Sequence, residues 1–199
     1  MKLPDGKSLV ENVALRAEPG NALLVAGPAG IGKSTLLRAI AGLWPFGRGK
    51  VELSRGRAFF VPQKPYIPLG TLRQALIYPD HETVVSDDEL REVLVKVGLG
   101  VFAAELDVVD LWSQRLSGGE QQRLAFARVL LAKPAVIFLD EATSALDEAA
   151  EGEFYRMLRE APWHPTIVSV GHRSTLRAFH DSAFDLGATG ARPAASAAD

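Results

Sequence analysis

The sequence predicts an α/β fold in which a mostly parallel sheet is covered by helices on both faces. Two observations lead to this prediction. Short continuous apolar runs, typical of strands buried on both faces, alternate along the chain with longer segments of helical periodicity. The chain has 199 residues, of which 47% are hydrophobic and 23% are charged, as in a folded globular domain and unlike a disordered chain.

The strands and the first helix can be assigned in chain order. Four apolar runs are predicted to form buried strands, at residues 22–26, 58–61, 135–139 and 166–170. A helix is predicted over residues 33–41 because Leu36, Leu37 and Ile40 recur on one of its faces. A strand followed directly by such a helix is the repeating unit of a parallel sheet.

Residues 64–123, between the second and third strands, are predicted to form a helical insert. Three prolines between residues 62 and 68 predict an extended segment that leads into it. Ser86 and Thr71 are each followed three residues later by Glu or Gln, which is the capping-box pattern of a helix N-terminus. Residues 188–199 are rich in Ala and also contain Gly, Ser and Pro, and they are predicted to form a flexible tail.

The composition excludes several classes of protein. There is no Cys, so a disulfide scaffold and a thiolate zinc site are both ruled out. Lys and Arg number 22 against 24 Asp and Glu, and this net charge of −2 gives no electrostatic basis for a nucleic-acid partner. No apolar run reaches the roughly 20 residues that a membrane span requires, and the N-terminus lacks the apolar core of a signal peptide. We therefore expect the isolated chain to be soluble.

Residues 27–34 read GPAGIGKS and match the phosphate-binding pattern G-x-x-x-x-G-K-[ST]. Glycines allow the backbone to approach a phosphate closely, and the dipole of a helix beginning at Lys33 favours an anion. Lys33 would meet the β- and γ-phosphates, and Ser34 would offer its hydroxyl to Mg²⁺. An ordinary glycine-rich turn has a similar composition, but the predicted strand before this loop and helix after it favour nucleotide binding. The expected nucleotide-binding residues are Gly27, Pro28, Ala29, Gly30, Ile31, Gly32, Lys33, Ser34 and Thr35.

Two carboxylates, Asp140 and Glu141, follow the apolar run of the third strand. Parallel α/β sheets bind their ligands at the carboxyl ends of the strands. Asp140 is therefore placed to hold Mg²⁺, and Glu141 to polarise an attacking water near the γ-phosphate. On their own, acidic residues at a strand end are more often part of a cap or a turn. The phosphate-binding loop upstream shifts the balance towards catalysis.

Residues 116–123 read LSGGEQQR. Ser117, with Glu120 three residues later, has the pattern of another helix N-terminus. Ser117, Gly118 and Gly119 would present N–H groups and a hydroxyl at the positive end of that helix. This segment therefore predicts a second site that attracts anions.

With this motif the sequence resembles the nucleotide-binding domains of ABC transporters, in which LSGGEQQR is the signature motif. Other elements of that family appear in order. Gln63 matches the glutamine of the Q-loop, residues 144–147 (SALD) match the D-loop, and His172 matches the switch histidine. The resemblance covers residues 3–187, which is nearly the whole chain.

The resemblance implies a P-loop NTPase fold of the RecA type within one domain over residues 1–187. Its core would consist of residues 1–63 and 124–187, with a small antiparallel N-terminal portion. It also implies ATP and Mg²⁺ as cofactors and a head-to-tail pair of domains, with each ATP between the P-loop of one and the signature motif of the other. The residues acting on the partner's nucleotide would be Ser117, Gly118, Gly119 and Asp147. The catalytic residues would be Glu141, His172, Gln63 and Lys33, and the Mg²⁺ residues Ser34, Gln63 and Asp140.

Residues 61–73, with 41–45 and 169–174, resemble the fused half-transporters of the peroxisomal adrenoleukodystrophy type and their bacterial SbmA/BacA-like relatives. In those proteins, six membrane helices precede this domain in the same chain. The resemblance therefore implies two partners: a second copy of this or a similar domain, and a transmembrane domain fused N-terminally in the full protein. It implies a location at the cytoplasmic face of a membrane, the bacterial inner membrane.

The chain departs from the family at its N-terminus. The aromatic residue that usually stacks on adenine is replaced by Leu3, which offers apolar contact without π stacking. The strand that usually precedes this position is missing from the chain, so we expect an unpaired sheet edge there.

The resemblance favours an ATP-hydrolysing subunit or excised domain that drives transmembrane transport. One alternative is a soluble ABC ATPase of DNA repair, but Ser117 lies only 84 positions after Lys33, which leaves no room for the long coiled-coil arms of that class. A second alternative is a soluble ATP switch that dimerises without transport. Glu141 argues against a switch without turnover, because degenerate sites commonly lose this carboxylate.

Overall fold

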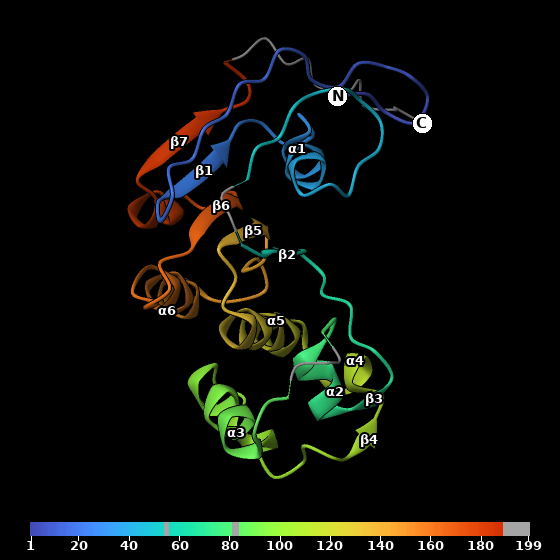
Figure 1. Ribbon diagram of the computed structural model, residues 1–199, viewed down its shortest axis with the longest axis vertical. Helices are drawn as coiled ribbons and strands as arrows, with labels where there is room; N and C mark the ends of the chain where they lie inside the picture. Colours follow the sequence, from blue (N-terminus) through green and yellow to red (C-terminus); the bar gives the residue numbers. More distant parts are fainter. Residues whose placement is uncertain (54–55, 81–83, 189–199) are drawn as a thin grey trace.

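The computed structural model describes residues 1–53, 56–80 and 84–188 (Figure 1). Apart from Ala188, the predicted tail at 188–199 therefore lies outside the described residues. In the described part of the chain, five strands form a parallel sheet in the order β2-β5-β6-β1-β7. These strands are β1 (Ala22–Ala26), β2 (Ala58–Val61), β5 (Val136–Asp140), β6 (Thr166–Val170) and β7 (Ser182–Asp185).

Helices cover both faces of this sheet, as predicted (Figure 1). The alternation of side chains along β5 shows it directly. Val136 and Phe138 belong to the apolar cluster that includes helix α1. Ile137 and Leu139 face the other way, into the larger cluster that includes α5 and α6. The three helices are α1 (Lys33–Ile40), α5 (Gly118–Ala132) and α6 (Glu148–Arg159).

The prediction that residues 58–61 form a fully buried strand is wrong in one respect. The strand is present, but only Val61 is buried, whereas Ala58 is exposed and the two phenylalanines between them are half-buried. The reason is the strand order, which places β2 at an edge of the sheet beside β5. An apolar run does not distinguish an edge strand from a central one.

The predicted insert at 64–123 holds the short elements that lie at the end of the molecule away from α1 (Figure 1). A two-stranded antiparallel sheet, β3 with β4, lies among them. Helix α5 continues across residue 123, the expected end of the insert, so the two parts of the chain share this helix. The short elements are β3 (Gly70–Thr71), α2 (Leu72–Ile77), α3 (Asp87–Lys96), η1 (Gly100–Phe102), β4 (Val109–Asp110) and α4 (Trp112–Arg115).

The expected antiparallel N-terminal portion corresponds to a single antiparallel bridge between Lys2 and Ser8. This segment is tied to the residues after α1, because the backbone N–H of Lys2 donates to the carbonyl of Phe46 at 3.0 Å. The indole N–H of Trp44 donates to the carbonyl of Lys2 at 3.0 Å. These bonds hold the N-terminal residues close to the loop that follows α1.

Local capping explains where the helices begin. Thr71 and Gln74 form a complete capping box at α2, with reciprocal bonds between each side chain and the other residue's backbone N–H. Ser86 accepts from the backbone N–H of Glu89 at 3.2 Å at the start of α3. Both helix starts are therefore fixed by residues three positions apart, which is why the sequence predicts them.

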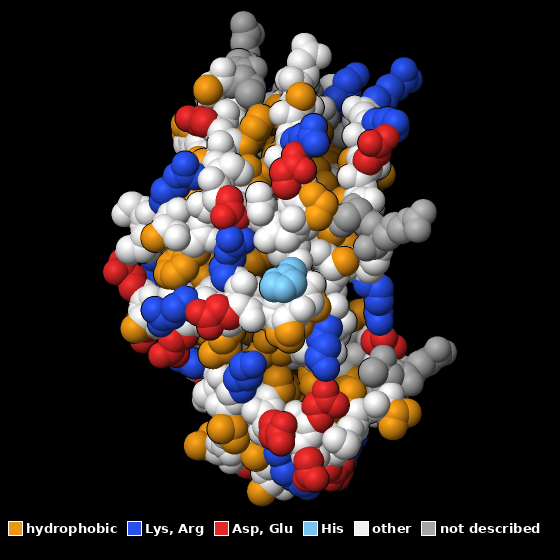
Figure 2. All heavy atoms as spheres, turned by 60° about the vertical axis from the view of Figure 1, so that its left-hand side comes forward, with side chains coloured by type: hydrophobic (Ala, Val, Ile, Leu, Met, Phe, Trp, Pro, Cys, Tyr) orange, Lys and Arg blue, Asp and Glu red, His pale blue; other side chains and the backbone are white. Residues whose placement is uncertain are grey.

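Figure 2 shows one face of the molecule, on which basic and acidic side chains are interspersed. Several of the described charges are paired, as in the insert, where Arg73 contacts Asp87 at 2.7 Å and Asp107 at 2.8 Å. Hydrogen bonds from Arg73 lower the pKa of both carboxyls. Of the helices in the described ranges, none combines the length and the apolar character needed to cross a membrane.

Candidate functional site

Strands β1, β2, β5 and β6 run parallel and end at the same edge of the sheet. The segments that follow them carry Lys33, Gln63, Glu141 and His172, respectively. Three of these residues are joined by hydrogen bonds through the carboxylate of Glu141. The fourth, Lys33, lines the same cavity as Glu141 and His172. The fold thus brings together residues that are up to 139 positions apart in the chain.

The loop after β1 wraps around the Lys33 ammonium. Lys33 Nζ donates to the carbonyls of Gly27 at 2.8 Å and Pro28 at 2.9 Å, and Lys33 is 4% exposed. Gly32, just before α1, has a φ of 102°, and a Cβ there would lie 2.9 Å from a methyl carbon of Leu9. Only glycine satisfies both constraints. The loop therefore presents the N-terminus of α1 without intervening side chains.

Burial lowers the pKa of Lys33, and the negative charge of Glu141 opposes this effect. A lysine whose charge is only partly compensated by carbonyl groups and one carboxylate stabilises an incoming anion. The electrostatics of the loop therefore match its backbone geometry, since both favour a phosphate group at the start of α1.

The C-terminal strand forms one flank of this loop. The backbone N–H of Leu186 donates to the carbonyl of Ala26 at 3.0 Å, which continues the β1–β7 pairing into the loop. A Cβ on Gly27 would lie 3.4 Å from the backbone nitrogen of Gly187. The first residue of the loop is therefore in close contact with the end of β7.

Glu141 lies between two side chains from neighbouring strand ends. Gln63 Nε2 donates to Glu141 Oε2 at 3.0 Å, and His172 Nε2 lies 2.8 Å from Glu141 Oε1. An ionised carboxylate accepts only, so this contact assigns the proton of a neutral His172 ring to Nε2. Glu141 has a φ of 50° and its N–H donates to the carbonyl of Val170 at 3.0 Å, so its backbone is also fixed. Such an uncommon backbone conformation in a non-glycine residue is typical of functional sites.

Asp140, the last residue of β5, is 1% exposed. Its Oδ2 accepts from Arg38 of α1 at 3.2 Å, whereas its Oδ1 is buried and has no hydrogen-bond partner among the described residues. A buried carboxylate oxygen without a partner has a free coordination position for a hard cation. The Ser34 hydroxyl and the Gln63 amide are the other oxygen donors that the resemblance implies, and oxygen donors are the type that Mg²⁺ prefers.

The cavity at the start of α1 has a volume of about 410 Å³. It is lined by the glycine-rich loop and the start of α1 and by Glu141 and His172, and Leu3 and Leu9 add apolar surface. Leu3, the residue at the position of the expected aromatic ring, thus reaches the cavity. The lining residues are Leu3, Leu9, Ala29, Gly30, Gly32, Lys33, Ser34, Thr35, Glu141 and His172.

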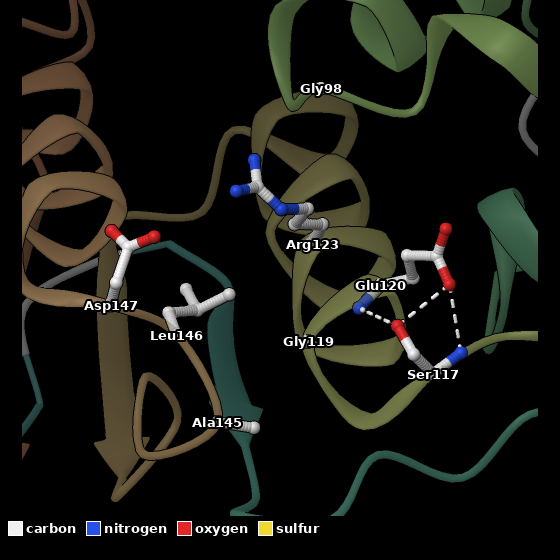
Figure 3. A pocket seen from close by; sticks show the side chains of 8 residues that line it. All are labelled: Gly98, Ser117, Gly119, Glu120, Arg123, Ala145, Leu146 and Asp147. Atoms are coloured by element: carbon white, nitrogen blue, oxygen red, sulfur yellow. Dashed lines mark hydrogen bonds between the residues drawn. The ribbon is translucent and has the colours of Figure 1, made fainter.

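A second cavity, of about 560 Å³, lies between the N-terminal half of α5 and the segment before α6 (Figure 3). Arg123 and Glu120 border it from α5, and Leu146 and Asp147 border it from the opposite side. It shares no lining residue with the first cavity. Its lining residues are Gly98, Ser117, Gly119, Glu120, Arg123, Ala145, Leu146 and Asp147.

Ser117 is engaged by its own capping box rather than free. Its N–H and its hydroxyl both donate to Glu120 Oε2, at 2.8 Å and 2.7 Å, and its Oγ accepts from the N–H of Glu120 at 3.3 Å (Figure 3). In this structure the Ser117 N–H and hydroxyl, which were expected to face an anion, therefore both donate to Glu120. The first-turn N–H groups of Gly118 and Gly119 remain those of a helix N-terminus. Asp147 likewise caps α6 through the N–H of Ala150 at 2.8 Å.

Sequence reasoning missed the buried polar residues that connect these loops. Gln122 Nε2 donates to the carbonyl of Gln63 at 3.0 Å and to Ser144 Oγ at 3.2 Å, and its Oε1 accepts from the N–H of Ala145 at 2.9 Å. Glu151 of α6 accepts from Thr143 in a similar way. Within the sequence, the only sign of Gln122 is that it belongs to the LSGGEQQR segment.

A glycine-rich loop around a lysine, at the start of the helix that follows the first strand of a parallel sheet, defines a P-loop nucleotide-binding domain. The pattern that characterises the ABC transporter family matches residues 10–144, more than half of the chain. The chain belongs to the ABC transporter family and carries its ATP-binding domain.

Two relatives and one solved structure show which members of the ABC transporter family are similar to this chain. An ABC transporter ATP-binding protein of Haemophilus influenzae is 46% identical over 89% of this chain and 30% of its own length. The human lysosomal cobalamin transporter ABCD4 is 38% identical over 90% of this chain and 32% of its own length. The structure of a bacterial Atm1-family ABC exporter with ATP bound has a TM-score of 0.74 and 26% identity over 90% of this chain. The predicted resemblance to half-transporters of the adrenoleukodystrophy type is thus confirmed.

This chain spans about a third of the length of these proteins, at 30%, 32% and 35% of their chains. The comparisons therefore cover the ATP-binding part of each relative.

Proposed function

We propose that this chain hydrolyses ATP and thereby powers an ABC transporter, with the nucleotide bound in the cavity at the start of α1. The observation that supports this best is the position of Glu141. It is fixed by Gln63 and His172 and faces the same cavity as Lys33. A general base must lie within reach of the water that it activates, beside the bound phosphates.

Nucleotide binding would follow from the loop and the first turn of α1. Backbone N–H groups of residues 27–35, except Pro28, which has none, would surround the phosphates. Lys33 would turn from the carbonyls that it now contacts to the β- and γ-phosphates. Leu3 and Leu9 would give the base apolar contact. Mg²⁺ would be held by Ser34, Gln63 and Asp140 and would neutralise phosphate charge when bound.

The hydrolytic step needs a base and a group that stabilises the transferred phosphoryl. Water would attack the γ-phosphorus while Glu141 accepts its proton, and the bond to the bridging oxygen of ADP would break. His172 would turn its Nε2–H from Glu141 Oε1 to a γ-phosphate oxygen when the nucleotide is bound. Gln63, which already contacts Glu141, would help to orient the water.

A second copy of this or a similar domain would complete each site. The residues expected to act in trans are Ser117, Gly118, Gly119 and Asp147. Ser117, Gly119 and Asp147 line the second cavity, which is separate from the first. A domain with two different nucleotide surfaces that do not meet within one chain is suited to a head-to-tail pair. ATP shared between both surfaces would favour the closed pair.

The remaining partner would be a transmembrane domain, which would hold the chain at the cytoplasmic face of a bacterial inner membrane. The surface proposed for it is the segment after Gln63 together with the helical insert. Exposed apolar side chains occur there: Tyr66 is 63%, Leu69 is 74% and Val109 is 74% exposed. The relatives that are named as transporters support this partner.

The test is a titration of this chain with ATP and Mg²⁺, followed by hydrolysis rates over a wide range of protein concentration. We expect saturable binding and a rate per chain that rises with concentration, because each site needs a second copy. Failure to bind ATP with Mg²⁺, or brisk hydrolysis by a strict monomer, would overturn the proposal. Binding and dimerisation without turnover would instead identify the ATP switch.

A further inference from the structure

The carboxylate of Glu151 lies in the interior, on helix α6, and contacts two loops of the candidate site. The residue is 2% exposed. Thr143 Oγ1 donates to Glu151 Oε2 at 2.5 Å, and Arg173 Nη1 lies 3.5 Å from Glu151 Oε1. Thr175 Oγ1 adds a longer contact to Oε1 at 3.5 Å. A buried carboxylate is retained in a fold only where partners compensate for its loss of water.

The residues that contact Glu151 are close in sequence to the catalytic candidates. Thr143 comes two residues after Glu141, and Arg173 comes directly after His172. On the cavity side, Glu141 and His172 are joined by their own 2.8 Å contact. The loops after β5 and β6 are therefore joined twice, once by the contact between Glu141 and His172 and once through the buried carboxylate of Glu151.

Arg173 extends this connection to the segment that borders the second cavity. Its Nη2 donates to the carbonyl of Leu146 at 2.7 Å, and Leu146 lines that cavity. The Nη1 atom is buried and makes no hydrogen bond within the described part of the chain, so Glu151 provides its countercharge. The backbone N–H of Glu151 also donates to the carbonyl of Asp147 at 2.9 Å.

We propose that Glu151 is a positioning residue for ATP hydrolysis. Its carboxylate keeps the Glu141 loop and the His172 loop in fixed relation, and through Arg173 it fixes the turn at Leu146 that faces the second copy. This inference rests on the proposed function. It adds that the buried acid of α6 connects the segments beside the two cavities, in addition to the contacts made by Gln122.

The test compares Glu151→Gln with Glu153→Gln, a matched change at an exposed position of the same helix. Glu151→Gln keeps the shape and one acceptor oxygen but removes the charge that Arg173 needs. We expect its kcat to fall by roughly 10- to 100-fold, because small displacements of reacting groups have effects of that size. Its KM for ATP should stay within about twofold of the Glu153→Gln value, since Lys33 and its loop do not contact Glu151.

A second pair of variants keeps the test decisive if Glu151→Gln folds poorly. Thr143→Ser retains the hydroxyl that donates to Glu151, and Thr143→Val removes it at nearly the same volume. We expect Thr143→Ser to keep the wild-type kcat and Thr143→Val to lower it, with similar thermal midpoints checked for both. Equal rates in this pair, or a Glu151→Gln enzyme whose kcat matches that of Glu153→Gln, would overturn the positioning role.

A spectroscopic measurement separates this inference from the proposed function. The ¹⁵N chemical shifts of the His172 ring, recorded without nucleotide, report its contact with Glu141. They should change in Glu151→Gln and stay at the wild-type values in Glu153→Gln. If the wild type and Glu153→Gln both fail to hydrolyse ATP, the proposed function fails. The chemical shifts would still decide whether Glu151 positions His172. Unchanged shifts in Glu151→Gln would refute the inference.

Discussion

Gln122 Nε2 donates to the backbone carbonyl of Gln63 at 3.0 Å. The helix that begins in the LSGGEQQR motif therefore contacts Gln63, whose side chain is hydrogen-bonded to Glu141. The same side chain accepts from the N–H of Ala145, beside the second cavity. Gln122 is 2% exposed and lies between Gln63 and the segment that borders the second cavity. This one contact set connects α5 with the loops after β2 and β5.

We expect Gln122→Met to lower both stability and turnover. The methionine fills a similar volume but leaves the Gln63 carbonyl and the Ala145 N–H without their partner, which costs about 1–3 kcal/mol of the free energy of unfolding. Chemical denaturation and ATPase assays measure the two effects. Gln114→Met, at an exposed position of α4, serves as the control and should change neither quantity. An unchanged unfolding free energy in Gln122→Met would show that these bonds contribute nothing.

Lys33→Ala should weaken ATP binding. Hydrogen bonds to charged groups contribute about 1.5–3 kcal/mol, which corresponds to a roughly 10- to 150-fold rise in Kd. Isothermal titration calorimetry measures this rise, with Lys96→Ala, at an exposed position of α3, as the control. Unchanged ATP affinity in Lys33→Ala would show that this lysine does not bind the phosphates.

The lowered pKa of Lys33 also predicts how ATP affinity depends on pH. Phosphates bind the protonated ammonium, so binding raises this pKa above its value in the free protein. Affinity should then be constant below the lowered pKa and should fall as pH rises through it, earlier than for an ordinary lysine with a pKa of about 10.4. Lys33→Arg, whose guanidinium keeps its proton, should show no such decline. Identical pH profiles for the two proteins would contradict this expectation.

Glu141→Gln should preserve ATP binding and slow hydrolysis. General-base catalysis contributes about 10²- to 10⁴-fold, and the amide cannot accept the proton of the attacking water. The variant should therefore accumulate as an ATP-bound dimer, measured by size-exclusion chromatography with light scattering. Glu160→Gln, just after α6, should behave like the wild type. Hydrolysis by Glu141→Gln at the wild-type rate would require another base.

Ser117→Arg should block dimerisation while ATP binding to the single chain stays nearly unchanged. The larger side chain would occupy the second cavity. The first cavity would be unaffected, because the two cavities have no lining residue in common. Ser113→Arg, at an exposed position of α4, places the same charge outside that cavity. Sedimentation of both variants with ATP gives the comparison. A closed ATP dimer of Ser117→Arg would exclude the head-to-tail arrangement.

Features that depend on neighbours in the sequence could be predicted. The helix after the phosphate loop is predicted over 33–41 and found over Lys33–Ile40, because the loop and the apolar face that define it are contiguous. The same holds for the capping boxes at Thr71 and Ser117. Their partners lie three residues away, within reach of one turn.

Features that depend on strand order and on contacts between distant segments could not be predicted from the sequence. The exposure of β2 follows from its place at the sheet edge, which no property of residues 58–61 reveals. The roles of Gln122, Glu151 and Arg173 arise from contacts with residues between 8 and 59 positions away. Their side chains look like surface polar groups in the sequence, and only the packing of α5 and α6 buries Gln122 and Glu151.

The contact between Gly27 and the end of β7 has a practical consequence for anyone who edits this protein. The backbone around Gly187 forms the outer support of the glycine-rich loop. A deletion that reached back to Leu186 would leave most of the sheet intact. It would nevertheless remove the contacts that support the glycine-rich loop, which is proposed to bind the phosphates. A tag or fusion joined beyond residue 188 would leave that support in place.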